Sequence, residues 1–138
     1  MPRDSDLSLL ISTIYLSKGE IRGRKRLQKT VCVLKHAYKI PFDFSFRPYF
    51  YGPYSEQLAD AMNVLEAVGL VVEVEDPLLS GIIQYDYFLT EKGKKVGEDI
   101  VSKLVHNKSL LSNLKSAVGE ISKLETSELV VIAKSSIQ

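Results

Sequence analysis

The sequence predicts an α+β fold that is mainly helical and carries a small antiparallel sheet. Several stretches repeat apolar residues with the period of an amphipathic helix. Residues 70–75 and 82–89 instead resemble two paired strands around a loop that contains Pro77 and Gly81. Residues 49–93 therefore have the order turn, helix, strand, loop, strand and start of another helix. This order predicts a winged helix-turn-helix with additional C-terminal helices.

The N-terminal third is expected to form two helices and one short strand. Asp6 or Ser5 can cap a helix that runs to about residue 17. A second helix over 24–39 places Leu27 on its core side and ends before Pro41. Residues 45–51 alternate in part between aromatic and polar side chains, so we expect a short strand there, at a sheet edge because Pro48 lies within it.

The remaining elements follow from cap and stop signals. Ser55 is a suitable N-cap for a helix over 56–68, which Gly69 ends. Thr90 caps a helix that runs to about residue 105, and two further helices are expected, the last starting at Thr126. We divide the chain into a winged-helix domain, 1–107, and a C-terminal helical extension, 108–138. The extension packs on the domain or mediates dimerisation, and we expect a homodimer because its apolar stripe needs a cover: Leu110, Leu114, Val118 and Ile121.

Composition limits the class of protein. A chain of 138 residues with 45% hydrophobic and 25% charged residues is typical of one globular domain. The single Cys32 excludes an internal disulfide and fits a cytoplasmic location. No apolar run is long enough to span a membrane, and the first residues lack the pattern of a signal peptide.

Charge is distributed unevenly along the chain. Residues 1–54 have a net charge of +6 and residues 55–138 a net charge of −5, within an overall +1. Seven Lys and Arg residues and no acid lie between Ile21 and Phe42. Such a stretch can neutralise DNA phosphates or form an ordinary solvated helix face. The candidate contacts with the DNA backbone are Arg22, Arg24, Lys25, Arg26, Lys29 and Lys39.

The helix at 56–68 occupies the position of a recognition helix but is acidic on its outward side. Gln57 and Asn63 are candidate readers of bases, since amide side chains pair with adenine. Carboxylates beside phosphates are repulsive, so we favour a solvated or protein-facing role for this helix. Glu56 and Asp60 are candidate protein contacts on it.

The loop between the two predicted strands, the wing, is acidic and apolar. It has four acids and no base between Glu73 and Asp86, and Leu78 and Leu79 at its tip suit a protein partner better than a DNA groove. We expect Ile82 and Ile83 to fold back onto the core. The aromatic residues of 42–54 can stack on bases or pack in the core, and we favour core packing.

No pattern in the sequence predicts catalysis. His36 and His106 have no metal-ligand spacing, and no phosphate-binding glycine loop or nucleophile motif is present. We therefore expect no enzyme activity, no cofactor and no metal.

Four motifs give the chain a resemblance to a known group. They are Gly23-Arg24-Lys25-Arg26-Leu27-Gln28-Lys29, Tyr51-Gly52-Pro53-Tyr54-Ser55, Gly69-Leu70-Val71 and Leu89-Thr90-Glu91-Lys92-Gly93. Over roughly residues 21–97 the chain resembles the YwgA-like family, bacterial and archaeal proteins regarded as predicted winged-helix regulators. The last motif is also similar to PadR-like repressors, and the Tyr-Gly-Pro turn to SocA-like antitoxin adaptors.

The resemblance implies a DNA-binding transcriptional regulator and no catalytic residue. Together with the charge pattern, it predicts a regulator that contacts the backbone of double-stranded DNA through the basic helix at 24–39. The alternative is a winged-helix protein-interaction module, such as an adaptor or an antitoxin-like subunit, that does not bind DNA.

Overall fold

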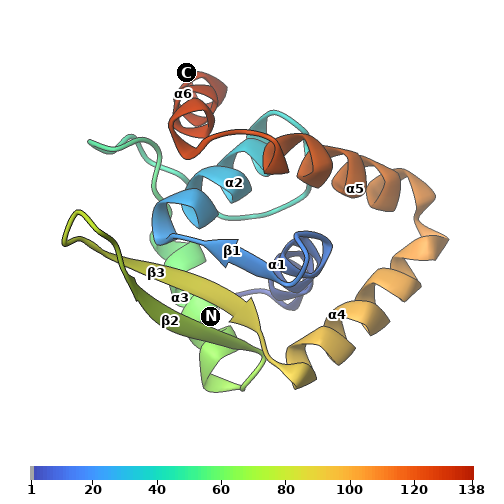
Figure 1. The fold of residues 1–138 in the computed structure, drawn as a ribbon. Helices are drawn as coiled ribbons and strands as arrows, with labels where there is room; N and C mark the ends of the chain where they lie inside the picture. Colours follow the sequence, from blue (N-terminus) through green and yellow to red (C-terminus); the bar gives the residue numbers. More distant parts are fainter. Residues whose placement is uncertain (1) are drawn as a thin grey trace.

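The computed structural model describes residues 2–138 and has an α+β architecture, with helices packed around a small sheet (Figure 1). The first six elements are α1 (Asp4–Leu16), β1 (Glu20–Arg22), α2 (Arg24–His36), α3 (Glu56–Ala67), β2 (Val71–Pro77) and β3 (Ile83–Leu89). The three strands form an antiparallel sheet in the order β1-β3-β2. The central strand β3 pairs Tyr87 with Ile21 on one side and with Glu73 on the other.

The C-terminal elements are α4 (Glu91–Lys103), the 3₁₀ turn η1 (Leu104–His106), α5 (Lys108–Ser122) and α6 (Thr126–Ser136). In Figure 1, α4 and α5 form an arch to the right of α1, and α6 lies above α2. Helix α4 packs on α1, where Gly97 approaches Tyr15 so closely that a Cβ would lie 3.0 Å from that side chain. None of the helices in residues 2–138 has the length and apolar character needed to cross a membrane.

One continuous core joins the early and late parts of the chain. Leu10, Val31 and Leu58 from α1, α2 and α3 are fully buried, as are Leu114 of α5 and Leu129 of α6. Val118 and Ile121 are buried in the same core, so this chain itself covers most of the stripe that motivated our expectation of a homodimer. The stripe therefore no longer supports a homodimer, and dimerisation stays a prediction.

Local signals determine several element ends as expected. The Ser55 Oγ accepts a hydrogen bond from Leu58 N at 3.1 Å, and the Thr90 Oγ1 accepts one from Gly93 N at 3.0 Å. Both predicted N-caps are confirmed. Gly93 is also required by packing, because a Cβ there would lie 2.0 Å from the carbonyl oxygen of Leu70.

The predicted strand at 45–51 is wrong, and a different strand completes the sheet. Residues 37–55 form a long connection whose only strand-like pairing is a bridge between Arg47 and Tyr54. The third strand is β1, which lies between the two helices expected at about 6–17 and 24–39. Because β1 has only three residues, its pattern is too short to identify, and pairing with β3 decides its conformation.

The expectation that Lys29 of α2 is accessible to DNA is also wrong. All residues from Leu27 to Leu34 are buried, because α6 packs along α2 and the 52–55 segment covers another part of its surface. Lys29 is 3% exposed and Cys32 is fully buried. Only the two ends of this helix present cations to solvent.

Candidate nucleic-acid interface

A groove of about 350 Å³ lies between the first turn of α2 and the β2–β3 hairpin. It brings together four of the predicted contacts, Arg22, Arg24, Lys25 and Arg26, with Leu78 and Ile82 from the wing. The other lining residues are Gly23, Ile83, Gln84, Tyr85 and Thr126. We call it the basic groove, since four cations and no carboxylate line it.

The turn from β1 into α2 positions these cations. Gly23 has φ 100°, a conformation that favours glycine, and its N–H donates to the carbonyl of Tyr85 at 3.1 Å. The first turn of α2 has no acid and no side-chain cap. Free N–H groups and the positive end of the helix dipole therefore add to the charge of the side chains.

The four cations differ in how far they are neutralised. Arg24 forms an ion pair with Glu73 and lies 3.9 Å from the ring centroid of Tyr85. The hydrogen bond that Arg24 donates to Glu73 raises the pKa of Arg24, so this guanidinium stays charged. Arg22 lies 3.5 Å from the Glu20 carboxylate.

Lys25 and Arg26 have no carboxylate partner among residues 2–138. The Lys25 Nζ lies 5.4 Å from the ring centroid of Tyr51. Arg26 donates to the carbonyl of Ile121 at 3.0 Å and to the Thr126 hydroxyl at 3.2 Å, which links α2 to the junction of α5 and α6. Because neither forms an ion pair with any of residues 2–138, the groove has an excess of positive charge.

Apolar side chains flank the basic groove on both sides. The wing tip presents Leu79, fully exposed, and Ile82, 66% exposed. On the other side, Phe50 is 82% exposed next to Tyr51. Figure 1 shows both loops projecting on the same side of the molecule, with the start of α2 between them.

The later cations of α2 have a structural role. The Lys29 Nζ donates to the carbonyl of Pro53 at 2.7 Å, and the Lys35 Nζ donates to the carbonyl of Phe44. Burial lowers the pKa of Lys29 to about 8. Next to Lys29, Gln28 forms a pair of hydrogen bonds with the backbone of Ser55: Gln28 Nε2 donates to Ser55 O at 2.9 Å, and Ser55 N donates to Gln28 Oε1 at 2.8 Å. These bonds hold the 44–55 segment against α2.

Two predicted DNA contacts therefore lie outside the basic groove. Lys29 is buried under the Gly52-Pro53 turn, where a Cβ on Gly52 would lie 2.9 Å from Lys29 Cε. Lys39 is exposed but follows the far end of α2, with φ 59°. A helix of 13 residues separates it from Arg24 by about 20 Å.

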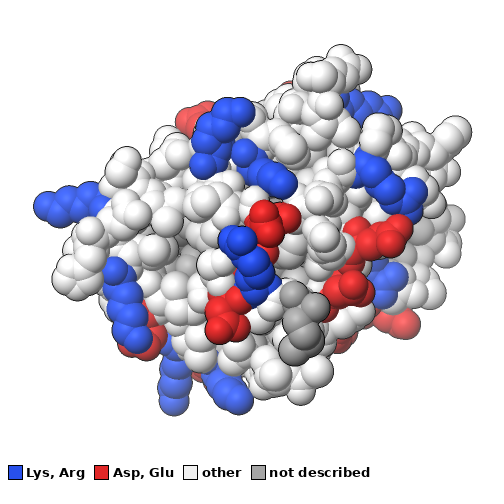
Figure 2. Space-filling view, turned by 180° about the vertical axis from the view of Figure 1, so that it is seen from behind, with Lys and Arg blue, Asp and Glu red and all other residues white. Residues whose placement is uncertain are grey.

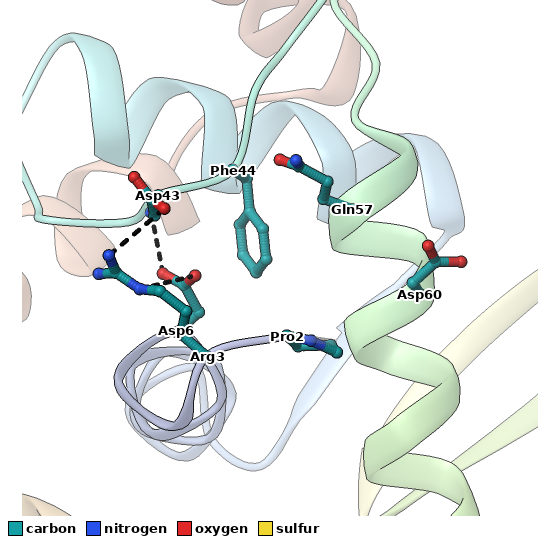
Figure 3. Close-up of a pocket in the computed structure, with 7 residues that line it drawn as sticks. All are labelled: Pro2, Arg3, Asp6, Asp43, Phe44, Gln57 and Asp60. Atoms are coloured by element: carbon teal, nitrogen blue, oxygen red, sulfur yellow. Dashed lines mark hydrogen bonds and ion pairs between the residues drawn. The ribbon is translucent and has the colours of Figure 1, made fainter.

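The predicted contacts on α3 are dispersed. Asn63 lines a hollow of about 230 Å³ that also contains Arg24 and Glu73. Glu56 forms an ion pair with Arg47 at 2.7 Å. Gln57 and Asp60 line a separate pocket of about 170 Å³ near the start of α1 (Figure 3).

The pocket in Figure 3 is a polar cluster with one cation, Arg3, and three carboxylates. The Arg3 guanidinium lies 3.9 Å from Asp6 and 3.3 Å from Asp43, and Asp6 Oδ1 accepts from Asp43 N at 2.9 Å. Gln57 Oε1 accepts a hydrogen bond from Ser45 N at 2.7 Å. Gln57 is thus already used to fix the 44–55 segment, which weakens its case as a reader of bases.

The face seen from behind has no continuous basic area. In Figure 2, Lys and Arg side chains lie next to Asp and Glu side chains across the surface opposite to the view of Figure 1. Helix α3 lies behind the sheet in Figure 1, so its acidic residues contribute to this mixed surface. The described residues also contain no cluster of three or more His, Cys, Asp or Glu side chains suited to a metal ion.

Sequence reasoning missed several groove residues. Ile82 and Ile83 were expected in the core, but they are 66% and 45% exposed, because the hairpin extends beyond the helices. Tyr85 and Glu73 were not singled out, although they orient Arg24. Glu73 pairs with Tyr87, two residues from Tyr85, so the strand register places Glu73 and Tyr85 diagonally on the same face of the hairpin.

Comparison with known proteins gives one informative similarity. No family model matches the chain. An uncharacterised protein, YwgA of Bacillus subtilis (strain 168), is 40% identical over 80 residues, or 58% of this chain and 47% of the relative. The match thus spans about half the length of that relative. The chain is similar in sequence to YwgA, in agreement with the resemblance found in its motifs.

Proposed function

We propose that this protein is a transcriptional regulator that binds double-stranded DNA through the basic groove. The observation that carries the proposal is the convergence of Arg22, Arg24, Lys25 and Arg26 on one groove that no carboxylate lines. Cations arranged in this way neutralise phosphates and release counterions, which is the main source of affinity for duplex DNA.

The order of the elements supports a winged-helix assignment. Helices α1, α2 and α3, with β1 between the first two, precede a two-stranded wing, and β1 pairs with β3. The chain departs from a simple helix-turn-helix because residues 37–55 separate α2 from α3. We therefore assign the contact to the first turn of α2 and the adjacent wing, instead of the acidic α3.

Within this proposal, the cations have separate roles. Lys25 and Arg26 contact phosphate directly, since no carboxylate competes for them. Arg24, held by Glu73 and stacked on Tyr85, keeps the wing at a constant position beside α2. Contacts of this kind set affinity and carry little sequence information.

The test is a titration of a mixed-sequence duplex by fluorescence anisotropy at 50 and 200 mM salt. The wild type is compared with Arg22→Glu/Lys25→Glu, and the matched control is Lys95→Glu/Lys115→Glu, which changes the net charge equally at exposed positions of α4 and α5. We expect salt-sensitive binding by the wild type and the control, with a slope of about 0.9 for each phosphate neutralised. The groove variant loses most of this binding. Absence of binding at 50 mM salt, or equal losses in both variants, contradicts the proposal.

The second candidate function is a protein-interaction module, an adaptor or antitoxin-like subunit. The observation that favours it is the exposed apolar side chains beside the groove, Leu79, Ile82 and Phe50. Exposed apolar clusters commonly mark protein contacts. If the duplex does not bind, capture of a partner from native lysate by the wild type, but not by Leu79→Glu/Ile82→Glu, supports this alternative.

A further inference from the structure

A second groove, of about 610 Å³, lies between the turn that joins α1 to β1 and the C-terminal half of α5. Its volume is in the range of small-molecule sites. Arg22 and Arg26 line both this groove and the basic groove, so the two share a wall. The remaining lining residues belong to neither the wing nor α3.

The floor of this second groove is apolar, and the space next to Gly119 is empty. Ile21 and Val118 are core residues that line it, together with the partly buried Leu16 and Leu124. Gly119 lies in the interior of α5, and a Cβ built there meets no atom within 4 Å. Glycine within a helix costs about 1 kcal/mol relative to alanine. Neither close packing nor a left-handed backbone requires it here, so its effect is to keep the groove open.

The rim of the second groove carries cations from three elements. Lys18, Arg22 and Arg26 come from the α1–β1 turn, β1 and α2. Lys18 has φ 62°, a left-handed conformation that is uncommon for a residue with a side chain. The only carboxylate lining the groove is that of Glu20, which is paired with Arg22.

A hydroxyl that makes no hydrogen bond to residues 2–138 lines the same groove. Thr30 is 4% exposed, and its hydroxyl makes no hydrogen bond within the described part of the chain. By contrast, the hydroxyls of Ser12, Thr13 and Ser17 each donate to a backbone carbonyl of α1. Among residues 2–138 the buried polar side-chain atom that lacks a partner is His36 Nε2, so the Thr30 hydroxyl is open to the groove and can contact a ligand atom there.

We propose that the second groove binds a small organic carboxylate with an apolar body. The carboxylate lies among Lys18, Arg22 and Arg26, within reach of the Thr30 hydroxyl, and the apolar body lies on Ile21 and Val118 above Gly119. A hydrophobic floor with a few convergent polar groups is the usual composition of such sites. Since Arg22 and Arg26 also line the basic groove, a bound carboxylate reduces the positive charge available to DNA phosphates there. This effect on DNA binding rests on the proposed function.

Calorimetric titration of the full chain tests the binding site without DNA. The probes are sodium decanoate and 4-phenylbutyrate, below their micellar concentrations, with decyltrimethylammonium and inorganic phosphate as controls. We expect saturable binding of at least one carboxylate, at least tenfold tighter than either control. Binding of neither carboxylate, or equal binding of the cationic amphiphile, overturns the proposal.

Variants locate the binding. Gly119→Leu places a side chain in the groove and is expected to weaken binding at least tenfold, whereas Gly119→Ala, as the control for helix stability, retains more of it. Thr30→Val preserves shape and is expected to weaken binding several-fold by removal of the hydroxyl. If Gly119→Leu does not fold, Thr30→Val and Lys18→Gln test the location instead. Unchanged affinity of both variants for the carboxylate probes contradicts binding in the second groove. A failure of DNA binding leaves these titrations unaffected, so the two proposals fail separately.

Discussion

The two ends of the basic sequence in α2 have different surroundings, although the residue types are the same. At the start of the helix, Arg24 and Lys25 are exposed and border the basic groove. One to three turns later, Lys29 and Lys35 donate hydrogen bonds to the carbonyls of Pro53 and Phe44. A run of cations in one helix therefore divides into exposed and buried groups according to what packs on each turn.

The division also explains why two of the motifs occur together in one chain. Gln28 and Lys29 belong to the first motif, and Pro53 and Ser55 to the second, and hydrogen bonds join them in the structure. The Ser55 that Gln28 holds is in turn the N-cap of α3. The buried half of α2 therefore sets where α3 begins, while the exposed end supplies charge.

The largest effect is expected from Gln28→Leu. This change removes both hydrogen bonds to the backbone of Ser55. It leaves the buried Ser55 N–H without a partner, and the Ser55 carbonyl keeps only the bond from Ala59 N at 3.3 Å. We expect a loss of about 2–4 kcal/mol in the free energy of unfolding. Urea denaturation measures it, with the exposed Lys25→Leu as the control at the other end of the helix. A loss no larger than that of the control would show that these bonds do not stabilise the fold.

The second effect is a rise in stability at alkaline pH that depends on Lys29. Its pKa is about 8 in the folded chain, against an ordinary value of 10.5. Between these values the unfolded chain holds a proton that the folded chain has lost, so stability increases as pH rises from about 8 to 10.5. We expect the wild type to gain on the order of 2 kcal/mol more than Lys29→Met over this window, measured by urea denaturation. Parallel pH profiles for the two proteins would refute this.

A smaller effect in the acidic range is expected from His36. Its Nε2 is buried without a hydrogen-bond partner, and burial, then Lys35 and Lys39, lower its pKa. As pH falls below the ordinary value of 6.5, the unfolded chain takes up a proton first, so stability decreases. His36→Phe, packed beside Phe46, should flatten the profile between pH 7 and 5 by less than about 1 kcal/mol. An identical slope in both proteins would contradict the assignment.

The smallest effect is expected where a charged residue is removed from the buried half of α2. Lys29→Met should change the affinity for duplex DNA by less than about twofold, because its Nζ cannot reach a phosphate from beneath the Gly52-Pro53 turn. Lys25→Met should weaken the same binding several-fold and reduce the salt slope by about one. Anisotropy titrations of both variants compare the ends directly. Equal losses would show that the 52–55 segment opens on binding.

Local chemistry was enough to predict much of the fold and part of the candidate site. The caps Ser55 and Thr90, the helix start at Thr126 and the paired strands of the wing were all predictable, because each depends on residues near in sequence. The cluster Arg22 to Arg26 could be singled out by charge alone. Its placement beside Tyr85 could not, since that contact depends on the pairing of β1 with β3.

Capping residues, hydrophobic periodicity and charge are local properties, and they predict where the helices and the hairpin lie and which stretch is basic. Which cations remain available depends on packing between distant parts of the chain. Lys29 and Arg24 are five positions apart in one helix. Helix α6 and the 52–55 segment cover Lys29, whereas Arg24 borders the basic groove beside the β2–β3 hairpin. The physical reason is that burial of a charge depends on partners distant in the chain, which helical periodicity does not contain.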